Sequence, residues 1–182
     1  ILPDSLTEVT VTGGALLDGA FDHCAGLKKV TLTEGVNQMG SGVFGDCTGL
    51  TEVNLPGTLT ALSPNTFRGC VKLAEIAIPD SVTSIGVNAF SGCVLLSDIQ
   101  LPEGLLSIGA GAFKGCAGLE DITFPEQITG IENEAFAGCT KLTAVELPDR
   151  IVTVGKEAFA GCTGILRVAL PATMTEIGIG AF

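Results

Sequence analysis

One stretch of the chain decides its fold: residues 90–113 read FSGCVLLSDIQLPEGLLSIGAGAF. Its first and last residues, Phe90 and Phe113, are 23 residues apart, and the same interval separates eight phenylalanines along the chain. They are Phe21, Phe44, Phe67, Phe90, Phe113, Phe136, Phe159 and Phe182. Seven cysteines keep this interval, each three residues after a phenylalanine. A fixed period of this length is typical of a solenoid, in which each unit stacks on a copy of itself.

The alternation of apolar and polar residues within one unit predicts a strand. Positions are numbered here from the phenylalanine, which is position 0 of its unit. Position 9 holds Val or Ile and position 11 holds Leu, Ile or Phe, whereas positions 8 and 10 are mostly polar. This period of two indicates a half-buried strand, which the proline at position 12 ends in six units. A second extended piece is expected near positions 15 to 18, and a turn with a short helical piece from position 19 through the cysteine.

Identical strands one period apart have room for a full crossover, so we expect them to stack in parallel with right-handed connections, about 4.8 Å apart. Residues 1–20 read as one more, shortened unit, with Leu6, Val9 and Val11 in its strand. The sequence shows no linker and no shift in composition. It therefore predicts one repeat array over residues 1–182, expected to be a fragment of a longer chain without its terminal caps.

The repeated pattern Leu-x-x-Ile-x-Leu-Pro-x-x-Leu-x-x-Ile-Gly-x-x-Ala-Phe-x-Gly-Cys resembles the BspA-like, treponemal-type leucine-rich repeats of 23 residues. The resemblance implies an α/β repeat solenoid of about eight units, a right-handed superhelix with a parallel sheet on its concave face. It also implies a role in adhesion or recognition, since proteins of this family are commonly secreted or exposed on the surface of bacteria and parasitic protists. Similar arrays occur in free-living eukaryotic microbes. The family pattern is structural and assigns no binding residue.

Composition narrows the classes of partner. The chain has 9 Lys and Arg against 20 Asp and Glu, a net charge of −11. This balance argues against nucleic acids and anionic membrane surfaces, which are bound by clustered basic residues. It is compatible with a basic protein partner, with a divalent cation, or with solubility alone. No run of about 20 apolar residues is present, so we expect no membrane span.

The regular cysteines and the only histidine are expected to be structural. In-register cysteines point the same way, which disfavours disulfides, so we expect seven free thiols packed as small apolar groups. Reduced thiols fit a reducing intracellular compartment, although burial would also protect them outside the cell. His23 has no second histidine and no cysteine at ligand spacing, so we expect a surface residue with no metal or catalytic role. The eight in-register phenylalanines and Phe124 are all expected in the core.

The acidic columns are the one candidate site in the sequence. Position 8 should face solvent, and four consecutive units carry a carboxylate there. Beside them, position 10 supplies further polar side chains. The predicted partner-binding residues are Glu52, Asn54, Glu75, Asp98, Gln100, Asp121 and Thr123. A second acidic column follows the prolines, at Glu34, Asp80, Glu103, Glu126 and Asp149.

Two interpretations of these columns stay open. They form an acidic concave groove for a basic peptide, a basic protein face or Ca²⁺, although nothing else supports calcium. Alternatively, they are a solvated surface inherited by duplication of one acidic repeat. We predict a non-enzymatic protein-binding module without catalytic, cofactor or metal residues, acting in adhesion or recognition. The alternative is an intracellular scaffold or structural subunit of a larger assembly in a eukaryotic microbe.

Overall fold

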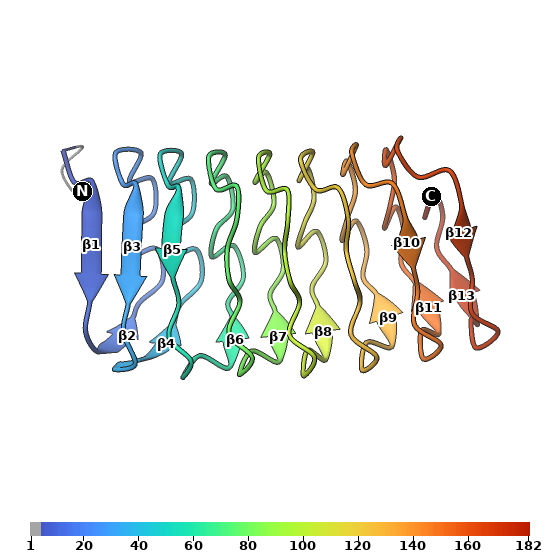
Figure 1. Ribbon diagram of the computed structural model, residues 1–182, viewed down its shortest axis with the longest axis horizontal. Helices are drawn as coiled ribbons and strands as arrows, with labels where there is room; N and C mark the ends of the chain where they lie inside the picture. Colours follow the sequence, from blue (N-terminus) through green and yellow to red (C-terminus); the bar gives the residue numbers. More distant parts are fainter. Residues whose placement is uncertain (1–4) are drawn as a thin grey trace.

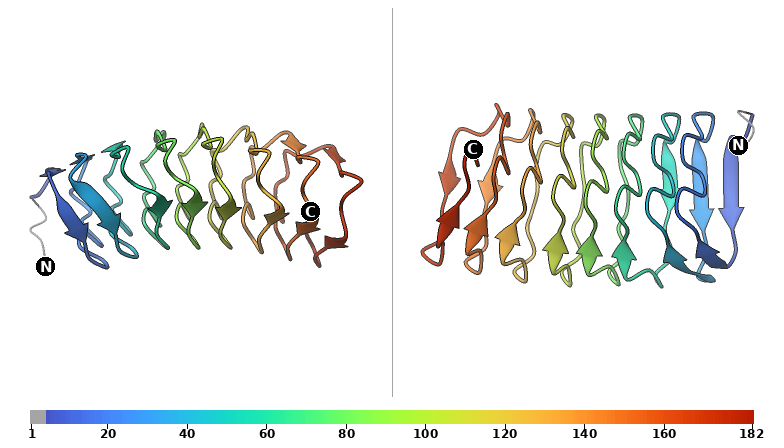
Figure 2. Two further views of the ribbon diagram at one scale, coloured as in Figure 1. Left: turned by 90° about the horizontal axis from the view of Figure 1, so that it is seen from below. Right: turned by 180° about the vertical axis from the view of Figure 1, so that it is seen from behind.

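The computed structural model describes residues 5–182, which form one row of stacked turns (Figure 1). The row has about seven turns of the 23-residue period, where about eight units were expected. Figure 2 shows that the first and last described turns lie at opposite ends of the row. The strands are β1 (Glu8–Val11), β2 (Gly14–Leu16), β3 (Lys29–Leu32), β4 (Val36–Met39), β5 (Glu52–Asn54), β6 (Ala61–Leu62), β7 (Ser84–Ile85), β8 (Ser107–Ile108), β9 (Gly130–Ile131), β10 (Val145–Glu146), β11 (Thr153–Val154), β12 (Val168–Ala169) and β13 (Glu176–Ile177).

The strands form two columns, as the alternation in the sequence predicts. The front column contains β1, β3, β5, β10 and β12, together with isolated parallel bridges from Glu75 to Asp98 and from Thr123 to Glu146. The rear column contains the sheets β2-β4, β6-β7-β8 and β13-β11-β9. Every pairing is parallel, and from β3 onward it joins residues one period apart, as in Val145 to Val168. The parallel stacking is therefore confirmed, whereas right-handed winding and a concave front face stay predictions.

The expected helical piece is wrong, and with it the α/β class. No helix occurs within residues 5–182, and the fold is a β-solenoid. The segment around each phenylalanine, here called the corner, instead alternates between right- and left-handed backbone, because the residues two before and two after it have positive φ. These residues include Gly42, Asn88 and Glu134 before a phenylalanine, and His23, Asp46 and Gly92 after one. Left-handed residues at this spacing prevent successive α-helical turns.

The corners bond to one another in place of a helix. The amide of Phe44 donates to the carbonyl of Thr66 in the next turn at 2.9 Å, and Phe90 donates likewise to Ala112 at 2.7 Å. The rings form one stack, with neighbouring centroids 5.2–5.7 Å apart and ring planes within 3–18° of each other. This stack is the centre of the core, and the prediction of buried phenylalanines holds from Phe44 to Phe159. It is wrong for Phe182, which is 49% exposed because no further ring covers it.

The cysteines line the same corner. Each thiol from Cys47 onward donates a hydrogen bond to the phenylalanine carbonyl of the preceding turn, for example from Cys47 Sγ to Phe21 O at 3.1 Å. Cys47, Cys70, Cys93, Cys116, Cys139 and Cys162 are buried and form no disulfide, as predicted. Burial raises the pKa of Cys47 and of Cys116 to about 12. These thiols are therefore packing groups. Within residues 5–182, no helix is long and apolar enough to cross a membrane.

Candidate functional site

The front face is defined by the side chains at positions 8 and 10 of the front strands. Burial alternates along each strand: Val53 on β5 is buried, whereas its neighbours Glu52 and Asn54 are exposed. The same alternation places all seven predicted residues on this face, exposed to solvent. Since the turns stack one period apart, Glu75 lies beside Asp98, to which its backbone is bridged. The predicted row of side chains therefore exists.

The carboxylates of this row differ in their partners. Glu52 Oε1 accepts from Lys29 Nζ at 2.7 Å, and this hydrogen bond is the main reason why the pKa of Glu52 lies below its usual value. Asp98 Oδ1 accepts only from the neutral amide of Gln100, at 3.0 Å. Glu75, Asp98 and Asp121 form no ion pair with any residue in 5–182. The row thus begins with a neutralised carboxylate and continues with three whose charge is unpaired.

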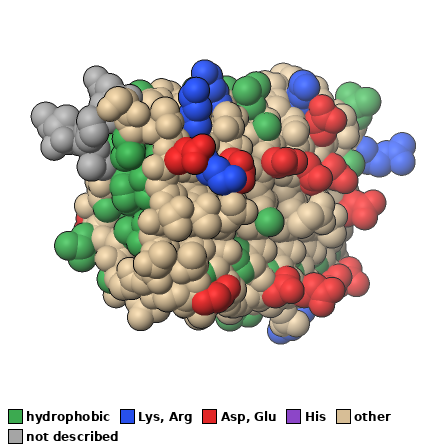
Figure 3. All heavy atoms as spheres, turned by 60° about the vertical axis from the view of Figure 1, so that its left-hand side comes forward, with side chains coloured by type: hydrophobic (Ala, Val, Ile, Leu, Met, Phe, Trp, Pro, Cys, Tyr) green, Lys and Arg blue, Asp and Glu red, His purple; other side chains and the backbone are tan. Residues whose placement is uncertain are grey.

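Two open grooves lie along the front face. The first groove, of about 560 Å³, is lined by Glu52, Asn54, Glu75, Asp98 and Gln100, together with the strand residues between them. The second groove, of about 480 Å³, is lined by Asp121, Thr123, Glu126, Glu146 and Asp149, with Phe124 and Leu147 at its apolar side. Figure 3 shows acidic side chains gathered in an upper and a lower row on one face of the molecule. The grooves are hollowed on the face that the predicted residues occupy.

The predicted residues divide unequally between these grooves. Five of them line the first groove, and only Asp121 and Thr123 line the second. Sequence reasoning did not include Glu126, Glu146 and Asp149 among the site residues. Two of these belong to the acidic column after the prolines, so their signal was visible. The sequence did not show that the folded turn brings positions 10 and 13 to the same groove.

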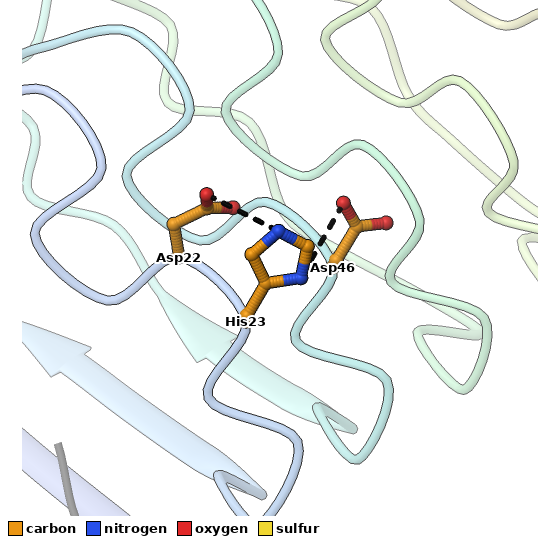
Figure 4. A group of neighbouring side chains, drawn as sticks. All are labelled: Asp22, His23 and Asp46. Atoms are coloured by element: carbon orange, nitrogen blue, oxygen red, sulfur yellow. Dashed lines mark ion pairs between the residues drawn. The ribbon is translucent and has the colours of Figure 1, made fainter. Parts of the chain in front are cut away.

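A second group of polar side chains lies at the corner near the N-terminal end (Figure 4). The ring of His23 lies between two carboxylates, with Nε2 3.5 Å from Asp22 Oδ2 and Nδ1 3.8 Å from Asp46 Oδ2. The prediction for His23 considered only histidine and cysteine as further ligands, whereas the period brings the carboxylate of Asp46, in the next unit, beside the ring. The three residues are of types that bind metal ions. However, His23 is largely exposed and Arg68 donates to the same Asp46 oxygen, so a cation would have to displace the guanidinium.

Comparison with known proteins agrees with this architecture. A leucine-rich repeat protein from Bacteroides ovatus has 28% sequence identity and a TM-score of 0.89, over 98% of this chain and 49% of that one. The leucine-rich repeat protein of T. pallidum has 27% identity and a TM-score of 0.72, over 98% of this chain and 76% of that one. The chain thus spans about half the length of the first of these proteins.

More distant likeness concerns the fold alone. The pneumococcal vaccine antigen PcpA has 18% identity and a TM-score of 0.56, over 97% of this chain and 57% of that one. No curated protein matches the chain. The model of the BspA type leucine-rich repeat region matches residues 14–142 and 84–182, in six copies. Together these matches cover nearly the whole chain, and the chain therefore belongs to the family of BspA-type leucine-rich repeat proteins.

Proposed function

We propose that this chain is a protein-binding module that recognises a basic protein surface through its front face. The observation that carries the proposal is the charge state of the row. Glu75, Asp98 and Asp121 stand in neighbouring turns, exposed and without an ion pair to any residue in 5–182, whereas Glu52 at the start of the row has a lysine partner. The two grooves give partner side chains a place beside these carboxylates. The family resemblance favours adhesion or recognition at a cell surface as the setting.

Electrostatics explains why a cationic partner suits this row. Like charges one turn apart repel each other by about 1 kcal/mol per neighbouring pair in water, before screening by salt. A lysine or arginine placed between two such carboxylates replaces that repulsion with attraction to both. Attraction between exposed charges acts mainly on the association rate and weakens as salt rises. Binding should therefore be stronger at low ionic strength.

The proposal is tested with a pair of charge-reversal variants. Glu75→Lys with Asp98→Lys reverses the first groove, and Glu132→Lys with Glu176→Lys makes the same change in net charge at exposed residues that line neither groove. Labelled oligolysine and oligoglutamate peptides serve as probes in fluorescence anisotropy, at about 0.05 M and about 0.3 M salt. We expect the first variant to lose most oligolysine binding, the control to keep it, and oligoglutamate to bind neither. Equal loss in both variants would mean that net charge alone attracts the peptide, and would refute a specific site.

A scaffold role would use other surfaces of the solenoid. Leu95 and Leu106 are 54% and 58% exposed, and neither lines a groove of the front face. Both replace the shorter or polar residues found at the same positions of most other units. Leu106→Lys would therefore disrupt a scaffold contact while leaving oligolysine binding unchanged. Partner capture is compared between the unsubstituted protein, Leu106→Lys and the front-face variant Glu75→Lys with Asp98→Lys. Loss of capture in Leu106→Lys alone indicates a scaffold contact, and loss in the front-face variant alone indicates recognition through the front face.

A further inference from the structure

The steps between successive turns are not equally connected. A step is the contact between one turn and the next. At each step, the front strands of the two turns can pair with each other, and so can their rear strands. The steps on either side of Glu75 keep the rear pairs β6-β7 and β7-β8, and the two steps after Asp121 keep the rear pairs β9-β11 and β11-β13. The first two steps keep the front pairs β1-β3 and β3-β5. Within residues 5–182, only the step from the Asp98 turn to the Asp121 turn has strand pairing on neither side.

The rear gap has a cause in the sequence at position 19. This position is glycine in five units, and its amide donates to the rear strand of the preceding turn, as from Gly109 to Ile85 O at 2.8 Å. A Cβ atom on Gly109 would lie 2.6 Å from the backbone nitrogen of Val87, which is closer than real Cβ contacts. At the step in question the residue is Glu132, which carries a Cβ. Its amide donates to no acceptor among the described residues, because the two turns cannot approach as closely.

Among the units that begin at a described phenylalanine, Ser63 is the other non-glycine residue at position 19, and it shows how such a gap is otherwise bridged. The rear strands β4 and β6 beside it are also not paired with each other. There, however, the Ser63 hydroxyl donates to Met39 O at 2.6 Å, in place of the missing amide bond. The front strands of that step, β3 and β5, remain paired. Glu132 has no such hydroxyl, and its step has no front pair.

The front side of the same step also has no strand pair or bridge. Its cross-turn bond from the Glu120 amide to Ser97 O is 3.4 Å long, close to the 3.3 Å of the equivalent bond from Thr143 to Glu120 in the next step. The Asp121 turn carries Phe124 at position 11, where the other units have Leu or Ile. The Phe124 ring packs edge-on against Phe136, with centroids 5.4 Å apart. This larger side chain adds volume to the turn that has no front pair with the turn before it.

The corner, in contrast, is continuous across this step. Asn88, Phe90 and Gly92 donate to the carbonyls of the next corner at 3.0, 2.7 and 2.7 Å. The Phe90 and Phe113 rings stack with centroids 5.3 Å apart. A step whose corner is fully bonded, while its front and rear columns have no strand pair, has the construction of a hinge whose axis follows the corner.

We infer that the solenoid consists of two stiff blocks joined by a hinge between Ile108 and Glu132, with the phenylalanine corner as its pivot. The first groove belongs to the N-terminal block and the second groove to the C-terminal block, since their linings end at Gln100 and begin at Asp121. Opening of the hinge changes the angle between the two grooves. The front face is then a pair of half-sites whose spacing adapts to the partner. This consequence rests on the proposed function, whereas the hinge itself does not.

The hinge is tested by hydrogen exchange of the unsubstituted protein, followed by mass spectrometry. Segment 118–132 spans the loosened step, and segment 95–109 is its equivalent one turn earlier. Loss of cross-turn hydrogen bonds and opening of the hinge should make exchange in 118–132 about tenfold faster. Glu132→Gly, which removes the Cβ and allows the amide to reach Ile108 O, should bring that rate close to the rate of 95–109. Glu157→Gly, a glutamate-to-glycine change outside both segments at a residue whose positive φ suits glycine, is the control and should alter neither segment.

A second measurement separates hinge motion from amides that are simply unbonded. Ile131→Cys and Ile85→Cys place a thiol at the same buried position beside the loosened step and beside paired steps. A thiol reagent reaches either site only when the turns separate. We expect about tenfold faster labelling at position 131, and slowing of that labelling by Glu132→Gly. Equal labelling rates at the two sites, or equal exchange in the two segments, would overturn the hinge, whatever the peptide-binding experiment shows.

Discussion

Substitution of Gly109 tests the packing rule on which the hinge depends. Gly109→Ala adds a single Cβ, which would lie 2.6 Å from Val87 N and 2.8 Å from Gly86 C. Both neighbours are backbone atoms, so relief requires the two turns to separate and the hydrogen bond from Gly109 to Ile85 to lengthen. The backbone conformation of Gly109 is not left-handed, so the alanine itself is allowed there. The whole effect should therefore come from the contact between turns.

The size of the effect follows from three contributions. A lost hydrogen bond costs about 1 kcal/mol and overpacking costs about 1–3 kcal/mol. The smaller entropy of the unfolded alanine chain returns about 0.4–1 kcal/mol. We expect Gly109→Ala to lower the free energy of unfolding by about 1–3 kcal/mol.

Gly104→Ala is the matched control. Its added Cβ would have only Asp80 O nearby, at 3.9 Å, and its backbone is also not left-handed. This variant should be neutral or slightly more stable than the unsubstituted protein. Urea unfolding followed by far-ultraviolet circular dichroism measures both variants, because the chain has no Trp or Tyr for fluorescence. If Gly109→Ala were as stable as Gly104→Ala, a Cβ at position 19 would not separate the turns, and Glu132 would not explain the loosened step.

Two further predictions concern the core. Phe90 is fully buried and stacked on both sides, so Phe90→Ala should cost about 3–5 kcal/mol in urea unfolding, whereas Phe182→Ala, at a half-exposed ring, should cost clearly less. Burial raises the pKa of the Cys47 and Cys116 thiols from 9.0 to about 12, so these groups stabilise the folded state below pH 9 and lose that contribution as pH rises towards 12. The urea midpoint should fall over this range, and thiol titration at neutral pH should find both groups unreactive until the protein unfolds; rapid reaction in the folded protein would contradict their burial.

The repeat period carried most of the fold because it fixes register. Once Phe90 and Phe113 occupy the same place in successive turns, every other position aligns too, and the buried columns at positions 9 and 11 follow from alternation alone. The same logic placed Glu75 beside Asp98 on an exposed face. These predictions needed no knowledge of backbone angles, since they depend only on which residues recur.

The corner could not be predicted in the same way, because its conformation is set by the sign of φ. Gly92 and Gly115 have a left-handed backbone, which glycine favours. Asn88 and Glu134 adopt the same conformation, and a glutamate in the sequence does not predict a positive φ. Position 19 is a related case. The sequence showed that this position is usually glycine, but not why. The structure gives the reason: a Cβ there would contact the backbone of another turn, whereas the backbone at Gly86 and Gly109 is not left-handed.

Departures from the repeat are therefore the informative residues of this chain, and they are not scattered at random. Phe124 and Glu132 change positions 11 and 19 of the same turn, one on its front side and one on its rear, and this turn has no strand pair with the turn before it. Either change alone would leave one strand ladder intact, as Ser63 does beside the paired strands β3 and β5. Their combination removes both ladders between the two grooves while the corner stays bonded. A hinge therefore needs two substitutions in one turn, and Glu132→Gly alone should be enough to remove it.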